Sequence, residues 1–373
     1  MLGEHEFSRK STILYFSDKT SSFLTNEMGW IHKPIHFLDE IKENPGLAEN
    51  CVMVLLVGNS IKEIETLQNL PRNSIWVLLY GDETWSPRLN RNLMHQPSLI
   101  GILRPYPVPT RSLKSIWNIL PSSFSYLPNK FGFFRVVFCF FVSVVIVLRQ
   151  SYIERLHRNT SKVNLGFLPG YTEIFADAFR AVCGESSSSK SLLSLNLEFL
   201  ENKKEIKFSF VGQVGGVWRG LALAKVKELI PFQDFKMTPR IGFGGTLGAN
   251  EASRDTAMDF VETNLKSRFV ISPPGNYSGS TFRWLESLIC GAIPLQAFPH
   301  PYDPGFRPPI QLPKWLETGS WESIIKMAML RDVEEVKRDN LGLRREVLNF
   351  LNTINESLIL ITEKIAWHSE RNG

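Results

Sequence analysis

The sequence predicts an α/β protein built from two Rossmann-like, doubly wound domains that face each other across a cleft. Short apolar segments rich in β-branched residues alternate with amphipathic segments over residues 11–83, and the alternation starts again after residue 204. Continuous apolar runs between amphipathic helices are typical of strands buried in a parallel sheet. A length of 373 residues also fits two domains.

The N-terminal half begins with strands separated by helices. The clearest strand is CVMVLLVG (51–58), an unbroken apolar run that ends in Gly-Asn. The expected elements are strands at 11–16, 51–58 and 74–83, helices at 35–44 and 60–70, and, after a less regular stretch, a strand near 162–171 and a helix at 172–183. The serine-rich segment 184–191 has the composition of a flexible linker. We therefore expect a first domain over residues 1–185, with an apolar insertion at about 121–158.

The C-terminal half starts again with a strand, EIKFSFVGQ (205–213), that runs into a glycine-rich turn. The expected elements after it are helices at 221–230, 256–268, 281–291 and 321–330, strands at 269–273 and 292–297, a polar glycine-rich segment at 241–255, and a long amphipathic stretch at 333–367. This order predicts a second domain over residues 200–330. Residues 331–373 are expected to form helices that pack across both domains.

Composition excludes several classes of protein. Hydrophobic residues make up 43% of the chain and charged residues 21%, so the chain can bury a core and is not disordered. The net charge of +5 contains no run dense enough for binding nucleic acid by charge alone. The four cysteines lie far apart without ligand spacing, and His32 and His36 lack a third ligand, so we expect neither a metal site nor a disulfide framework.

One apolar run, FGFFRVVFCFFVSVVIVL (131–148), permits three interpretations. It is a buried strand or helix, with its Val, Ile and Phe content favouring a strand; or a peripheral or re-entrant membrane contact over residues 131–158; or a true span, for which it is short. The first twenty residues contain no apolar core of a signal peptide. The expected location is the cytoplasm, with membrane association left open.

The segment FVGQVGGVWRG (210–220) is the first candidate binding motif. A predicted buried strand ends at Gly212, where glycine lets a ligand approach the backbone, and a helix follows soon after. Gln213 offers a hydrogen bond, and Arg219 offers a cation that can pair with a phosphate. The alternative is a glycine-rich turn with a surface arginine.

The second motif is SRFVISPPGNYSGSTFRWLESLICGAIPLQ (267–296). Its strand delivers a Pro-Gly loop and small hydroxyl groups to the carboxyl edge of a sheet and to a helix start, where phosphates bind. Arg283 and Glu286 lie three residues apart on one helix face, and a carboxylate there can accept hydrogen bonds from a ribose diol. The candidate ligand-binding residues are Pro273, Gly275, Ser278, Ser280, Thr281, Arg283 and Glu286. The alternative is a helix cap with a surface Arg–Glu pair.

This second motif resembles the nucleotide-sugar-binding motif of exostosin-like glycosyltransferases, family 47, which have the GT-B fold. The pattern R-x-x-E-A-L-x-x-G-C-I-P-V is matched at its Arg, Glu, Gly and Ile-Pro positions, whereas Ser287 replaces the alanine and Cys290 comes one place early. The segments LLYGDE (78–83), LRPYPVP (103–109) and FLPGY (167–171) resemble, in order, a ladder of motifs in the N-terminal half of that family. The last of these lacks a leucine, and the apolar run lies in the long gap before it.

The resemblance implies a glycosyltransferase, a hexosyl- or pentosyltransferase of polysaccharide biosynthesis. It would transfer a sugar from a nucleoside diphosphate donor, with UDP favoured, to a hydroxyl of a glycan acceptor. GT-B enzymes generally need no metal, and helix N-termini and arginine can stabilise the leaving diphosphate; no cofactor is expected. Asp82 or Glu83, at a strand end, is the candidate base for an inverting transfer, and Arg104 and Tyr106 are expected to line the acceptor side of the cleft.

The competing interpretation is a noncatalytic relative that binds a nucleotide or glycan as a membrane-associated scaffold. A Golgi membrane location replaces the cytoplasm if the source is eukaryotic.

Overall fold

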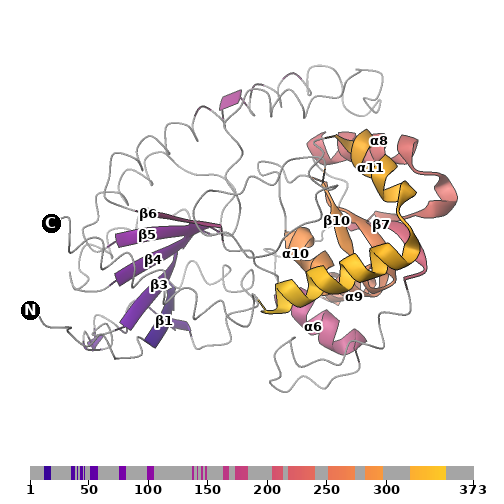
Figure 1. Ribbon diagram of the computed structural model, residues 1–373. Helices are drawn as coiled ribbons and strands as arrows, with labels where there is room; N and C mark the ends of the chain where they lie inside the picture. Colours follow the sequence, from indigo (N-terminus) through magenta and orange to yellow (C-terminus); the bar gives the residue numbers. More distant parts are fainter. Residues whose placement is uncertain are drawn as a thin grey trace, which may run out of the picture.

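The computed structural model describes the strands of two parallel sheets and the helices around the second (Figure 1). The described residues are 12–17, 35–37, 40, 43–44, 46, 51–57, 75–80, 99–104, 137, 141, 144–145, 148, 163–167, 173–183, 204–212, 217–239, 251–273, 282–296 and 320–349. The protein is therefore α/β, as predicted.

The first sheet has six parallel strands in the order β2-β1-β3-β4-β5-β6. Its strands are β1 (Thr12–Ser17), β2 (Ile35–Phe37), β3 (Cys51–Val57), β4 (Ile75–Tyr80), β5 (Leu99–Arg104) and β6 (Val163–Phe167). The predicted strands at 11–16, 51–58, 74–83 and near 162–171 are confirmed within a few residues. The helix expected at 60–70 and the linker at 184–191 lie outside the described residues.

The helix prediction for 35–44 is wrong at its start, because residues 35–37 form strand β2. This strand pairs in parallel with β1, with Tyr15 opposite Ile35. Ile and Phe favour strands, so the sequence IHF is suited to the extended backbone that it adopts here. Helical backbone comes later, at Glu40 and Glu43. We did not predict β5, whose apolar run is interrupted by Gly101 next to a register shift.

The second sheet has four parallel strands in the order β10-β9-β7-β8. The strands are β7 (Ile206–Gly212), β8 (Phe235–Pro239), β9 (Ser267–Ile271) and β10 (Ile293–Leu295), and the helices are α6 (Glu173–Val182), α8 (Val217–Leu229), α9 (Glu251–Leu265), α10 (Phe282–Ile289), α11 (Trp321–Leu330) and a helix over 333–349. All the helices and three of the strands match predicted elements, with shifted ends. Strand β8, an edge strand in which Phe235 and Met237 alternate with polar residues, was not predicted.

The core of this second unit forms around β7, whose last five residues are buried. Phe208 stacks on Phe269 of the neighbouring strand β9, with ring centroids 5.3 Å apart. Helix α6 packs on α9, where Phe175 meets Phe260 edge to face at 6.2 Å. Thus α6, which precedes the serine-rich segment in the sequence, contributes buried rings to the unit that follows that segment (Figure 1).

A buried ammonium joins two helix ends at the amino edge of this sheet. Lys204 is buried just before β7, and its Nζ donates to the carbonyl of Asn264 at 3.4 Å and to that of Cys290 at 3.0 Å. These carbonyls lie at the C-terminal ends of α9 and α10, which carry partial negative charge and lack helical hydrogen-bond donors. Lys204 therefore caps both helices at once.

The apolar run differs from the interpretation that its composition favoured. Its described residues, Val137, Phe141, Val144, Val145 and Leu148, are helical rather than extended. The large side chains are also exposed, by 62% at Phe141, 58% at Val145 and 63% at Leu148. The buried-strand interpretation is therefore wrong for these residues. Among the described residues, no helix combines the length and hydropathy needed to cross a membrane.

Candidate functional site

The strand order of the second sheet creates a topological switch point between β7 and β9. From β7 the chain passes through α8 to β8 on one side, and then through α9 to β9 on the other side of β7. In open parallel sheets, ligands bind at the carboxyl ends of the two strands where the direction reverses. Gly212 ends one of these strands, and Pro273, which is buried, follows the other after one residue.

Arg283 of α10 lies directly against Gly212 at this edge. A Cβ atom added to Gly212 would overlap with the Nη2 atom of Arg283, and the φ angle of Gly212 is +145°. Both facts require glycine at this position, because a side chain would need a rare backbone conformation and would displace the guanidinium. The close approach of Arg283 to the backbone of Gly212 therefore brings together two motifs that are far apart in sequence.

The guanidinium of Arg283 is held between aromatic rings in the interior. Its Cζ atom lies 5.0 Å from the ring centroid of Phe210 in β7 and 5.9 Å from that of Phe260 in α9. Arg283 is only 6% exposed, and its Nε is buried without a hydrogen-bond partner among the described residues. The rings attract the cation, but they give its N–H groups no strong acceptor.

Arg219 of α8 and Glu286 of α10 complete the charged group. Burial and the neighbouring Arg219 guanidinium lower the pKa of Arg283 to about 9, while the Glu286 carboxylate acts in the opposite direction. Glu286 is 2% exposed. The interpretation of Arg283 and Glu286 as a surface pair is therefore wrong. Among the described residues, this group therefore contains two cations and one carboxylate.

Both arginines lie at helix N-termini, where the helix dipole disfavours a positive charge. Arg219 is the third residue of α8 and Arg283 the second of α10, and neither helix has an acidic residue in its first turn. Helix N-termini carry partial positive charge and favour acidic side chains. Two arginines, two helix N-termini and a buried location together make this edge of the sheet attractive for an anion.

The structure brings together four of the predicted binding residues and places two others. Gly212, Arg219, Arg283 and Glu286 belong to one group, and Pro273 lies at the same edge. Arg104 is the last residue of β5 and lies at the carboxyl edge of the first sheet, where β5 pairs with β4. The other candidates lie outside the described residues: Asp82, Glu83, Tyr106, Gln213, Gly275, Ser278, Ser280 and Thr281.

The sequence interpretation missed two features. The first is the aromatic support of Arg283, for which the only signal is the alternation of Phe208 and Phe210 in β7. The second is the switch point of the first sheet, which lies between β1 and β3 because β2 and β3 flank β1 on opposite sides. Asp18 follows β1 directly in the sequence. Strand order, which the sequence alone did not give, makes it a further candidate carboxylate.

Cys290 is not available for chemistry at this site. It is buried at the end of α10, and burial raises the pKa of its thiol. A thiol that stays protonated is a poor nucleophile and metal ligand. Within the part of the chain that the structure describes, no three His, Cys, Asp or Glu side chains group closely enough to hold a metal ion.

The chain was also compared with protein-family models, with curated proteins and with solved structures. No match was found in any of the three comparisons.

Proposed function

We propose that this protein is a glycosyltransferase whose second unit binds the diphosphate of a nucleotide-sugar donor between Arg219 and Arg283. The observation that carries the proposal is the buried arginine at the switch point. Arg283 is desolvated, has a lowered pKa, and lies with a second arginine at the N-terminal ends of two helices. Burial, the like charge of Arg219 and the helix dipoles all disfavour the charged form of Arg283. A bound anion would offset these three effects.

The same group supports a division of roles over the donor. The arginines and the helix N-termini would stabilise the negative charge that grows on the diphosphate as the sugar bond breaks. Glu286 lies about one helical turn after Arg283 in α10, and in this proposal it accepts hydrogen bonds from the ribose hydroxyls. This mechanism requires no metal ion, as the resemblance to GT-B enzymes implies.

The first sheet would carry the acceptor in a GT-B arrangement. An inverting transfer needs one carboxylate to take the proton of the attacking hydroxyl. The candidates are Asp82 and Glu83 after β4, and Asp18 after β1, with Arg104 and Tyr106 beside the acceptor. Each of the three carboxylates is replaced by its amide, Asp by Asn or Glu by Gln. The variant of the true base would lose turnover and keep donor binding, whereas the variants of the other two carboxylates would keep both turnover and donor binding.

The test is ligand-induced stabilisation of the full chain by UDP, GDP, dTDP and CMP, with and without EDTA. A ligand at one hundred times its Kd stabilises by about 2.7 kcal/mol, which is readily measured. Stabilisation by one nucleoside diphosphate that survives EDTA is the expected result. Turnover is then followed as release of the nucleoside diphosphate from its sugar donors.

Two variants separate the roles of the charged residues. Arg283→Met should abolish stabilisation by both the nucleoside diphosphate and pyrophosphate, and the melting temperature of the variant without ligand is measured alongside. Glu286→Gln should weaken binding of the nucleoside diphosphate but not that of pyrophosphate, because only the former has a ribose. No stabilisation by any nucleotide would refute the donor site, and binding without turnover would favour the scaffold interpretation.

A further inference from the structure

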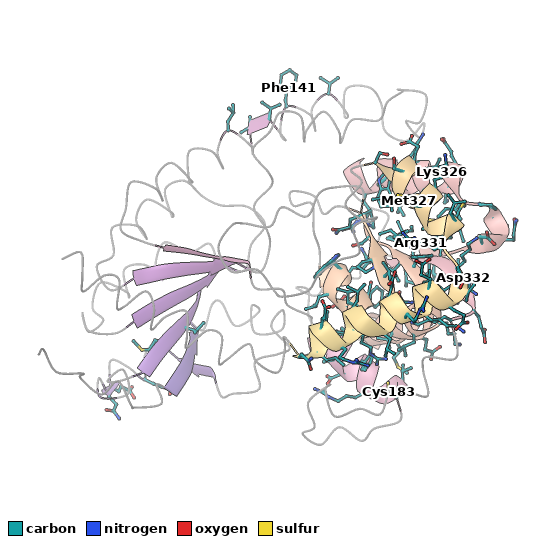
Figure 2. All side chains as sticks on the ribbon, viewed as in Figure 1. Phe141, Cys183, Lys326, Met327, Arg331 and Asp332 are labelled. Carbon is teal, nitrogen blue, oxygen red and sulfur yellow. The ribbon has the colours of Figure 1, made fainter. Side chains whose placement is uncertain are left out.

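The described residues of the apolar insertion form one helical face, which is partly exposed. Val137, Phe141, Val144, Val145 and Leu148 recur at spacings of three and four residues, which places them along one side of a helix. Phe141, Val145 and Leu148 are each more than half exposed. We call these five residues the apolar face. Figure 2 shows Phe141 at the outer edge of the molecule, away from the strands of both sheets.

Basic residues flank this apolar face in the sequence. Between residues 130 and 158 there are five basic residues and one acidic residue. The basic ones are Lys130, Arg135, Arg149, Arg155 and Arg158, and the acidic one is Glu154. By contrast, Phe232, which is 95% exposed, stands beside Gln233 and Asp234. Exposed apolar residues that occur singly need no explanation, whereas an apolar face of several residues, flanked in sequence mostly by basic residues, indicates a binding surface.

We propose that the apolar face docks on the surface of an anionic lipid bilayer. Phe141, Val145 and Leu148 enter the boundary between headgroups and acyl chains, and the flanking arginines contact the acidic headgroups. Charge favours this occupant over a second copy of the chain, because two copies of the face would bring their basic flanks together. The surface is distinct from the donor site and does not depend on the proposed transferase activity.

The experiment is flotation of the full chain with vesicles of phosphatidylcholine alone or mixed with phosphatidylserine. Binding is expected only to the mixed vesicles, and it should weaken strongly between about 0.1 M and about 1 M salt, where the Debye length falls from about 10 to about 3 Å. Phe141→Asp should lower the partition coefficient by about tenfold or more, because it removes one buried aromatic side chain and adds a negative charge.

The matched control is Phe232→Asp, the same substitution at an exposed phenylalanine outside the face. It should leave vesicle binding unchanged, and both variants should melt with the parent because both positions are exposed. Leu148→Asp provides a second test at another position of the face. Arg149→Glu combined with Arg155→Glu should remove the preference for phosphatidylserine.

Four outcomes would overturn the proposal. They are no flotation with either vesicle, equal binding to neutral and mixed vesicles, an equal loss with Phe232→Asp, and retention on the vesicles after extraction with high salt and carbonate. The last of these would identify an integral segment. Self-association that Phe141→Asp abolishes, in the absence of vesicle binding, would assign the face to a second copy.

Discussion

Replacing Gly212 by alanine tests the geometry of the candidate site more directly than removing a charge. The added methyl group would overlap with the Nη2 atom of Arg283 and would lie 3.7 Å from the ring of Phe210. The guanidinium has little room to move, because Phe210 and Phe260 lie 5.0 and 5.9 Å from its Cζ atom. The substitution therefore forces a change in the position of the group proposed to bind the anion.

The expected cost has two parts. Alanine at a φ angle of +145° costs about 1–3 kcal/mol of backbone strain. Moving Arg283 out of a favourable rotamer adds about 0.5–1.5 kcal/mol. The free energy of unfolding should thus fall by about 2–4 kcal/mol, which lowers the urea midpoint by about 1 M or more. Stabilisation by sulfate or a nucleoside diphosphate should be lost as well.

The control is Gly342→Ala in the helix over 333–349. Gly342 is exposed, and a Cβ atom there would meet no atom within 4 Å. Alanine should therefore stabilise this helix by about 0.5–1 kcal/mol. Combining Gly212→Ala with Arg283→Met should recover the rotamer cost but not the backbone strain, so the two changes should not be additive. Unchanged stability and unchanged anion binding in Gly212→Ala would refute the reasoning.

Three further predictions concern charges at different depths. Lys204→Met should lower the free energy of unfolding, measured by urea titration, by about 2–4 kcal/mol, because it leaves two buried helix carbonyls without their donor. Lys266→Met, at an exposed position, is the control and should change the free energy of unfolding by less than about 0.5 kcal/mol. Glu322 is bonded to Lys225 at 2.7 Å, and the hydrogen bond from this lysine lowers the pKa of the carboxyl. The contribution of this ion pair to the free energy of unfolding should be present above the unfolded pKa of the carboxyl and be lost as the pH falls through the lower folded pKa. It should stay below about 1 kcal/mol because the carboxylate is half exposed. An effect of Glu322→Gln on stability that persists at acid pH would contradict this. Sulfate binding requires the charged form of Arg283, so the affinity measured by calorimetry should fall by about tenfold per pH unit above about 9 in the parent. A sulfate affinity that does not change above this pH would contradict the role of Arg283.

Strands could be predicted from the sequence where burial leaves a clear pattern. Strand β7 is buried over its last five residues, so it appears as an unbroken apolar run. Strand β9 was predicted two residues late because it begins at the buried Ser267. The Oγ of this serine donates to the carbonyl of Thr263 at 2.6 Å and shares a hydrogen bond with the Oγ of Ser209 at 2.7 Å, partners that no local pattern reveals.

The candidate site was only partly predictable, for a related reason. The spacing of Arg283 and Glu286 predicts a shared helix face, and the two residues do influence each other electrostatically. The sequence left open whether the two residues are buried, because charged residues on an amphipathic helix usually lie on its exposed face. The contact of Arg283 with Gly212 depends on the strand order of the sheet, which brings β7 and β9 together only in the folded chain.

The position of α6 has a practical consequence for how the chain can be divided. The serine-rich segment 184–191 looks like the natural place to cut, yet the rings that cover α9 come from Phe175 and Phe179, upstream of it. A fragment that starts after the cut would expose Phe260 to water where Phe175 had packed. During synthesis, α6 leaves the ribosome before α9, the helix on which it packs. The shortest C-terminal fragment able to fold alone should therefore begin before Glu173.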